Sequence, residues 1–356
     1  MQNGFPLSTE LKMERVAVVL YNLGGPDKPE AIQPFLFNLF NDPLILRQVP
    51  PIRWILAKII SSRRTPIAKE IYAKIGGGSP ILEETRKQAW ALQEELEKDG
   101  KFKVFVAMRY WRPFADECID EVINFNPDSV ILLPLYPQFS TTTTESFLRI
   151  WKKNCKKRGF DKTTASVCCY PQEAGFVKAV SELVKLGISE AESKGPVKVL
   201  FSAHGIPKKF VVDGDPYESH VRATVGAVID CLNIPNLNYE VCYQSRVGPI
   251  EWLKPYTDEV IIDTAQKGHS IVVVPIAFVS EHSETLVELD MEYLDLALDN
   301  GAAAYIRTPT VGINANFIFG LASIVREAVG INDVIAPREL VCKKNCAACP
   351  SVRTGQ

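Results

Sequence analysis

Two short segments of the sequence place imidazole and carboxylate side chains where apolar runs end. The run Val197 to Phe201 leads directly into the segment that contains His204. The second segment, further along the chain, holds His282 and four glutamates: Glu281, Glu284, Glu288 and Glu292. Imidazole and carboxylate together suit a divalent cation such as Fe²⁺, and imidazole is well suited to accept a proton near neutral pH. The alternatives are a solvated acidic helix face and a structural histidine.

The elements that must position these groups show up as alternating patterns. Unbroken runs of apolar, often β-branched residues are typical of parallel strands covered on both faces. They are Val16 to Leu20, Val104 to Met108, Val130 to Leu135, Val197 to Phe201, Val260 to Ile262 and Ile271 to Ile276. Helical patterns lie between them, at Ser79 to Glu97, Gln172 to Lys194, Tyr217 to Leu232, Glu281 to Leu298 and Asn316 to Val329. The alternation predicts an α/β fold with helices flanking parallel sheets.

In this α/β arrangement, both charged segments are expected where strands end. His204 is expected just past the carboxyl end of a buried strand, which is the edge where open α/β sheets bind ligands. On one helix, the four glutamates would share a face in spite of the repulsion between like charges. His220 and His269 have no such neighbours and are expected at the surface.

Chain length predicts about two domains. With 356 residues, the loop-like stretch Asp161 to Ala174 is the expected boundary. The division is therefore 12–168 for the first half, 169–335 for the second half, which carries the His and Glu residues, and 336–356 for a cysteine-bearing tail.

Bulk composition excludes several classes of protein. A chain with 46% hydrophobic and 23% charged residues is globular, and a formal charge of −2 gives no electrostatic basis for nucleic-acid binding. Residues 1–14 lack an apolar signal-peptide core, and no run approaches about 18 apolar residues, so a cytoplasmic location is expected. Nine cysteines, an odd number, favour free thiols or metal ligands over a disulfide framework.

A series of short motifs resembles the ferrochelatase family over roughly residues 15 to 330. The motifs are LYNLGGP at 20–26, RRTP at 63–66, YAKIGGGSP at 72–80, MRY at 108–110, LYPQFST at 135–141, SAHG at 202–205, GDPY at 214–217, YQSRVGP at 243–249 and the acidic segment 281–292. Each motif is weak alone, but their order and spacing are specific. Nucleotide binding is disfavoured, because neither the G-x-G-x-x-G nor the Walker pattern is present.

The resemblance implies two flavodoxin-like or Rossmann-like chelatase domains with an active-site cleft between them. It implies an enzyme of the lyase class that inserts Fe²⁺ into protoporphyrin IX, releasing protohaem and two protons at the last step of haem biosynthesis. His204 and Glu284 would be the catalytic pair that also meets the metal. Glu281, His282, Glu288 and Glu292 would form a path for iron or protons.

The same resemblance implies a porphyrin pocket. Its lining would include Leu23, Arg64, Tyr72, Arg109, Tyr110, Tyr136 and Trp252. Aromatic side chains suit a planar ring, since they supply contact area at a small entropic cost. Ordinary core packing is the alternative for each aromatic residue.

Two other functions remain open. An enzyme of this family that uses coproporphyrin III is the closer alternative, and a non-enzymatic porphyrin or haem carrier is the alternative of another class. A carrier needs the pocket but no facing base and acid, so the presence of both His204 and Glu284 favours an enzyme.

The segment Pro50 to Arg64 has apolar residues at helical spacing together with Trp54 and several basic residues. A basic amphipathic helix with an aromatic residue can lie on an anionic bilayer. Peripheral contact with the cytoplasmic face of the membrane is therefore a hypothesis, and burial of the stripe in the core is the alternative. A homodimer is also left open.

The tail contains Cys342, Cys346 and Cys349 with C-x₃-C-x₂-C spacing, close enough to converge on one metal centre. In several ferrochelatases a C-terminal cysteine trio and one distant cysteine hold a [2Fe-2S] cluster, for which four thiolates are usual. In animal enzymes the distant cysteine stands where this chain has Thr141. Cys155 is the expected replacement, and Cys168 or Cys169 is the next candidate. A zinc site is the alternative to the cluster.

Overall fold

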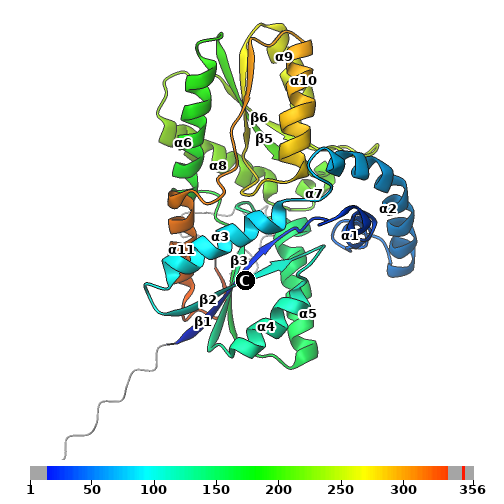
Figure 1. Ribbon diagram of the computed structural model, residues 1–356, viewed down its shortest axis with the longest axis vertical. Helices are drawn as coiled ribbons and strands as arrows, with labels where there is room; N and C mark the ends of the chain where they lie inside the picture. The colour runs from blue at the N-terminus through cyan, green and yellow to red at the C-terminus, as the bar shows by residue number, and fades with distance from the viewer. Residues whose placement is uncertain (1–13, 336–346, 349–356) are drawn as a thin grey trace, which may run out of the picture.

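The computed structural model describes residues 14–335 together with Ala347 and Ala348. These residues form two parallel sheets flanked by helices (Figure 1). The first sheet has the order β2-β1-β3-β4-β9, formed by β2 (Lys101–Met108), β1 (Arg15–Asn22), β3 (Ser129–Pro134), β4 (Thr163–Val167) and β9 (Val334–Ile335). The second has the order β6-β5-β7-β8, formed by β6 (Tyr239–Gln244), β5 (Val197–His204), β7 (Ser270–Pro275) and β8 (Ala304–Arg307).

The central strands of both sheets are apolar because both of their faces are covered. Val18 of β1 pairs in parallel with Val104 of β2 and Ile131 of β3. β5 likewise lies between β6 and β7, with Phe201 opposite Val274. Parallel pairing sends the carboxyl ends of neighbouring strands to the same edge. That edge of β5 carries His204.

The helices complete the layers on both sheets. In the first half they are α1 (Ile32–Phe40), α2 (Pro50–Ala73), α3 (Ile81–Leu96), α4 (Ala115–Phe125) and α5 (Ser146–Arg158), with a 3₁₀ turn η1 (Pro29–Ala31) and a short π-helix η2 (Thr141–Glu145). Those that follow are α6 (Ala174–Ala191), α7 (Lys208–Val212), α8 (Tyr217–Leu232), α9 (Thr257–Gln266), a π-helix η3 (Glu284–Glu292), α10 (Tyr293–Asp299) and α11 (Ala315–Ala328).

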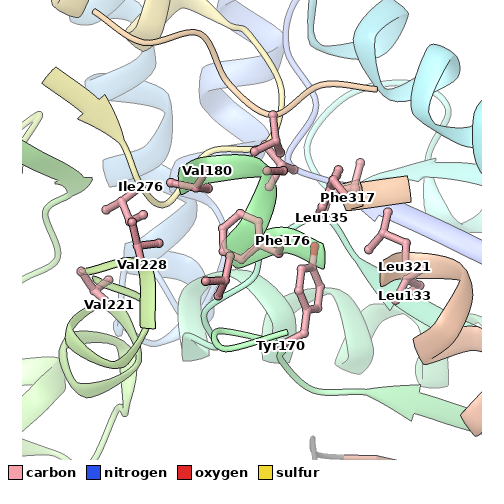
Figure 2. Close-up of a cluster of buried hydrophobic side chains, with 14 of the residues drawn as sticks. Leu133, Leu135, Tyr170, Phe176, Val180, Val221, Val228, Ile276, Phe317 and Leu321 are labelled. Carbon is pink, nitrogen blue, oxygen red and sulfur yellow. The ribbon is translucent and has the colours of Figure 1, made fainter. Parts of the chain in front are cut away.

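One hydrophobic cluster joins the two halves, and α6 and α11 run through it. Figure 2 shows Phe176 of α6 among Leu135 at the end of β3, Phe317 of α11 and Ile276 beyond β7. The rings of Phe176 and Phe317 are 5.9 Å apart. The halves therefore share a core, which fixes the cleft between them.

Two expected features of the chain path were wrong. The apolar run at Val260 to Ile262 lies in helix α9, where its residues cover β5 and β7, because a run this short fits a buried helix face equally well. The stretch Asp161 to Ala174, expected as a loop, contains β4.

The chain also returns to the first sheet at its far end. β9 pairs with β4 in parallel, and α11 packs on α3 as well as on α6. Residues 315–335 therefore contact the first half through β4 and α3 as well as the second half, and the division at 168 and 169 stays a prediction.

Helix α2 stands at the side of the molecule with α1, next to the junction of the halves (Figure 1). Three of its residues are buried, Ala57, Ser61 and Tyr72, while the side chains of its apolar stripe are exposed, with Trp54 at 49% and Ile55 at 53%. Burial of this stripe in the core is thus excluded. None of the helices in the described part of the chain has the length and apolar character needed to cross a membrane.

Candidate active site

A cavity of about 190 Å³ lies between the two halves, at the carboxyl edges of the sheets. The first half contributes Leu23 beyond β1 and Tyr136 beyond β3, and the second contributes His204, His282 and Glu284. The wall is mostly apolar, and it also includes Leu39, Ile45, Ile81, Leu135, Ile206, Ala277, Phe278 and Val279. An apolar slot with few convergent polar groups is typical of a ligand site.

His204 and Glu284 meet at this cavity from different elements. His204 is the last residue of β5, and Glu284 is the first residue of the π-helix η3. His204 Nδ1 donates to Glu284 Oε2 at 2.8 Å. Burial works against the charge on both groups, but the pairing is stronger: it raises the pKa of His204 and lowers the pKa of Glu284 to about 2. The structure thus brings together the two residues that the sequence predicted to face each other.

Glu288 is one turn further along η3, on the same side as Glu284. Ser245 connects the two carboxylates, because its single hydroxyl hydrogen is shared between Glu284 Oε2 and Glu288 Oε2, and its amide donates to Glu288 Oε1 at 2.9 Å. Tyr293 also donates to Glu288, at 3.0 Å. Burial and the neighbouring Glu284 raise the pKa of Glu288, so this carboxyl group holds a proton at a higher pH than usual.

His282 is buried, with its ring 4.4 Å from that of Phe278. Its Nδ1 lies 3.3 Å from the carbonyl oxygen of Ser280, which can only accept, so Nδ1 carries the hydrogen. Its Nε2 lies 3.9 Å from Glu284 Oε2. Burial lowers the pKa of His282, which favours the neutral imidazole, in which Nε2 carries the lone pair.

The other two glutamates of the predicted path lie elsewhere. Glu281 precedes η3 and accepts from Arg307 at 2.7 Å and from the amide of Thr310 at 2.9 Å. Burial raises the pKa of Glu281, but Arg307 and these hydrogen bonds bring it below its usual value. Glu292, at the far end of η3, forms an exposed ion pair at 3.4 Å with Lys74, the residue that directly follows α2. Of the four residues of the predicted path, the structure therefore brings His282 and Glu288 close to the central pair, and not Glu281 or Glu292.

The predicted pocket residues divide into two groups. Leu23 and Tyr136 line the cavity. Tyr72 is buried near the end of α2 and is not among the lining residues; its hydroxyl accepts from Ser283 at 3.4 Å, and burial raises its pKa to about 12. Arg64 lies over Phe40, and Trp252 donates to the carbonyl of Val247 at 3.0 Å. Neither of these two lines the cavity.

Arg109 and Tyr110 belong to a network that the sequence did not indicate. The side chain of Asp42 is 1% exposed. Its Oδ2 accepts from Arg109 at 2.6 Å, from Tyr110 at 2.9 Å and from Ser146. Its other oxygen accepts from the amide of Leu44 at 2.8 Å. Asp42 is an isolated acidic residue in an apolar stretch of the sequence. A carboxylate buried there would require partners, and this was the signal that could have indicated the network.

Several residues that line the cavity were also missed. They are Asn22, Gln138, Ser140, Thr142, Thr143, Tyr217 and Phe278. Four of these lie inside quoted motifs, so the motifs marked the right segments without showing which side chains face inward. Ser245 lies in the YQSR motif, and its φ of 64° is the unusual backbone conformation that aims it at the glutamates.

His220 was expected at the surface, which was wrong: it is 3% exposed, and its Nδ1 accepts from the amide of Phe139 at 3.2 Å. Helix α8 turns this face toward the first half. His269 is partly buried.

Cys342, Cys346 and Cys349 lie outside the described residues. Ala348, between the last two, donates its amide to the carbonyl of Gly214 at 3.2 Å. Cys155 is half-buried near the end of α5, and burial raises the pKa of its thiol to about 11. Cys168 and Cys169 are buried with their sulfurs 3.3 Å apart, beside Val334. Within residues 14–335, 347 and 348, no three His, Cys, Asp or Glu side chains group as a metal site would require.

The fold, two parallel sheets flanked by helices, is that of solved chelatases. The solved structure of SirB from Bacillus subtilis with Fe³⁺ superposes with a TM-score of 0.54 at 10% identity, covering 89% of this chain and 96% of SirB. A cobalt complex of SirB, the sirohydrochlorin chelatase from a B. subtilis subspecies, gives a TM-score of 0.52 at 12% identity, over 88% of this chain and 95% of that one. At this identity the likeness concerns the fold.

Sequence comparisons give the family. The ferrochelatase family profile matches residues 15–329. The ferrochelatase of Pelagibacter ubique is 44% identical over 94% of this chain and 98% of its own length. That of Caulobacter vibrioides is 50% identical over 89% and 91%. The chain therefore belongs to the ferrochelatase family, whose members are enzymes that insert iron into a porphyrin.

Proposed function

We propose that this protein inserts Fe²⁺ into protoporphyrin IX, releasing protohaem and two protons. The observation that carries the proposal is the His204–Glu284 pair, 2.8 Å apart at the wall of an otherwise apolar cavity. Protoporphyrin IX has two charged propionates, whereas coproporphyrin III has four. A mostly apolar wall accommodates the first more readily, since each buried charge requires a partner.

The chain's own groups account for the two tasks of the reaction. The ring must bend so that its nitrogens point at the metal, and contacts along the apolar wall offset that strain. Two protons must also leave. Approach of Fe²⁺ to the pair opposes the proton on His204, so metal binding there expels it. Neutral His282 and the carboxyl group of Glu288 then provide neighbouring positions that exchange protons.

The test is anaerobic incubation of the protein with Fe²⁺ and either protoporphyrin IX or coproporphyrin III, following the loss of porphyrin fluorescence. Faster turnover of protoporphyrin supports the proposal, and faster turnover of coproporphyrin supports the closer alternative. In His204→Ala, an enzyme loses insertion while still binding the ring. Wild-type protein that is folded and binds either ring without insertion would leave the carrier.

We also propose that the tail trio Cys342, Cys346 and Cys349 holds a [2Fe-2S] cluster with a fourth cysteine. Four thiolates would supply the usual ligand set. Cys155 is one candidate for the fourth ligand, but it lies towards the far end of α5, beyond η2. Cys168 and Cys169 pack beside Val334, which is two residues before the tail in the sequence.

Separate serine variants of these cysteines discriminate the candidates. The serine variant of the true fourth ligand, purified without oxygen, should lose both the visible absorption and the bound iron. Cys346→Ser should lose both signals as well. Wild-type protein with neither signal would contradict the cluster, and bound zinc in its place would support the alternative site.

We further propose that α2 rests on the cytoplasmic face of a membrane. Its exposed stripe of Ile52, Trp54, Ile55 and Ile59 runs beside Lys58 and Arg63. Protein should sediment with anionic vesicles at low salt, and Trp54→Ser combined with Ile55→Ser should reduce this. Wild-type protein that stays entirely in the supernatant would contradict the contact. A homodimer remains a prediction.

A further inference from the structure

A fully buried glutamine connects the two halves directly behind the cavity wall. Gln88 lies on α3 of the first half, among residues that otherwise pack as a hydrophobic face, such as Ala89 and Leu92. Its side chain is 0% exposed. An amide at such a position costs free energy unless its hydrogen bonds are all made, so its presence calls for specific partners.

All partners of Gln88 come from the other half. Its Nε2 donates to the carbonyl of Val279 at 2.7 Å and to the carbonyl of Gly312 at 3.0 Å. Its Oε1 accepts from the hydroxyl of Ser280 at 2.9 Å. Both amide hydrogens and the oxygen are therefore used, and they fix the segment that follows β7.

That segment carries reacting groups. Val279 and Ser280 both line the cavity, and the carbonyl of Ser280 accepts from Nδ1 of His282 at 3.3 Å. Glu284 follows two residues later. A chain of contacts thus runs from α3 through Ser280 to the imidazole that lies 3.9 Å from Glu284 Oε2.

We propose that Gln88 is a positioning residue that, through Ser280, fixes the orientation and the Nδ1-protonated form of His282, so that Nε2 faces the incoming metal and the pyrrole protons. The proposal rests on the proposed function of the site. It goes beyond that function by assigning to α3 of the first half a role in aligning groups of the second.

The test compares Gln88→Met with a matched variant on the same helix. Gln93→Met is the control, because Gln93 also bridges backbone groups, accepting from the amide of Val104 at 2.7 Å and donating to the carbonyl of Phe102 at 3.0 Å, but within the first half. We expect kcat to fall 10- to 100-fold in Gln88→Met, as for a small misplacement of reacting groups, with porphyrin affinity within about threefold. Gln93→Met should keep kcat while losing similar thermal stability.

A spectroscopic readout separates positioning from general destabilisation. With four histidines in the chain, long-range ¹H–¹⁵N spectra can be assigned with single His→Gln variants. His282 should be Nδ1-protonated in the wild type and a mixture of tautomers in Gln88→Met. Gln88→Glu retains the acceptor for Ser280, so it should recover part of the kcat and part of the wild-type His282 spectrum. Unchanged kcat, or an unchanged His282 spectrum, in folded Gln88→Met would overturn the proposal. Absence of insertion by the wild type would instead contradict the proposed function, and the spectrum would still report on Gln88.

Discussion

Two carboxylates, Asp42 in the first half and Glu284 in the second, both pair with a cationic or basic side chain, but Asp42 is buried whereas Glu284 is partly exposed, and their surroundings differ. Asp42 has Arg109, Tyr110 and Ser146 on one oxygen and a backbone amide on the other, and it does not line the cavity. Glu284 faces the cavity and shares the hydroxyl of Ser245 with a second carboxylate. A fully paired charge maintains the structure, whereas a charge with an open side can change its partner.

The crowding of carboxylates in the second half also explains why the pKa values of its two glutamates shift in opposite directions. In the second half, two glutamates crowd one protonated histidine, so the pKa of Glu284 is lowered to about 2 while that of Glu288 is raised. Opposite shifts in neighbouring groups are typical of sites that move protons. We expect substitutions to affect stability in the first region and turnover in the second.

The largest effect is expected for Asp42→Ala. It leaves Arg109 and Tyr110 without their partner, which should lower the free energy of unfolding by about 3 kcal/mol. Urea denaturation measures this. Asp213→Ala, which removes surface ion pairs with Arg47 and Lys209, should cost less than about 1 kcal/mol. Equal effects of the two substitutions would contradict the assigned role of Asp42.

Glu284→Gln should reduce kcat about 100-fold, because the partner that holds and charges His204 is lost. Stability should fall by no more than this ion pair contributes, since the amide keeps the shape of the side chain. The anaerobic insertion assay measures kcat. Glu292→Gln, on the same π-helix but in an exposed ion pair, should stay within about twofold of the wild type. A fall of similar size in both variants would show that the charge of the helix matters more than the pair.

Glu288→Gln should have a smaller effect, about tenfold on kcat. The amide oxygen can still accept from Ser245 and Tyr293, but the group no longer titrates. The variant should therefore lose the part of the pH dependence that arises from the raised pKa of Glu288. A pH profile of kcat identical to that of the wild type would exclude Glu288 from proton exchange.

The smallest effect is a pH dependence of stability. The raised pKa of His204 gives a contribution that is complete below its unfolded pKa of about 6.5 and is lost as pH rises through the folded value. The lowered pKa of Glu284 gives one that is complete above about 4.5 and is lost as pH falls toward about 2. The stability difference between wild type and His204→Ala should thus be largest between about pH 4.5 and 6.5. A difference that grows above this range would contradict the ion pair.

Much of the site could be predicted from the sequence because its residues follow clear patterns. His204 ends an apolar run, and the spacing of Glu284 and Glu288 puts them on one side of a helix even though that helix is a π-helix. Glu281 and Glu292 fit the same spacing, yet they pair with Arg307 and Lys74. Spacing predicts which residues share a helix face but not their partners, which here come from β8 and from the residue that follows α2.

The sequence by itself determined the alternation of strands and helices, the family motifs and the two segments that carry imidazole and carboxylates. Local patterns suffice for these because apolar periodicity and strand ends are properties of contiguous residues. Only the tertiary structure decided that β9 returns to the first sheet, that Asp42 gathers Arg109 and Tyr110, and that Gln88 joins the halves behind His282. Those contacts link residues far apart in the chain, and their geometry depends on how the sheets and helices pack.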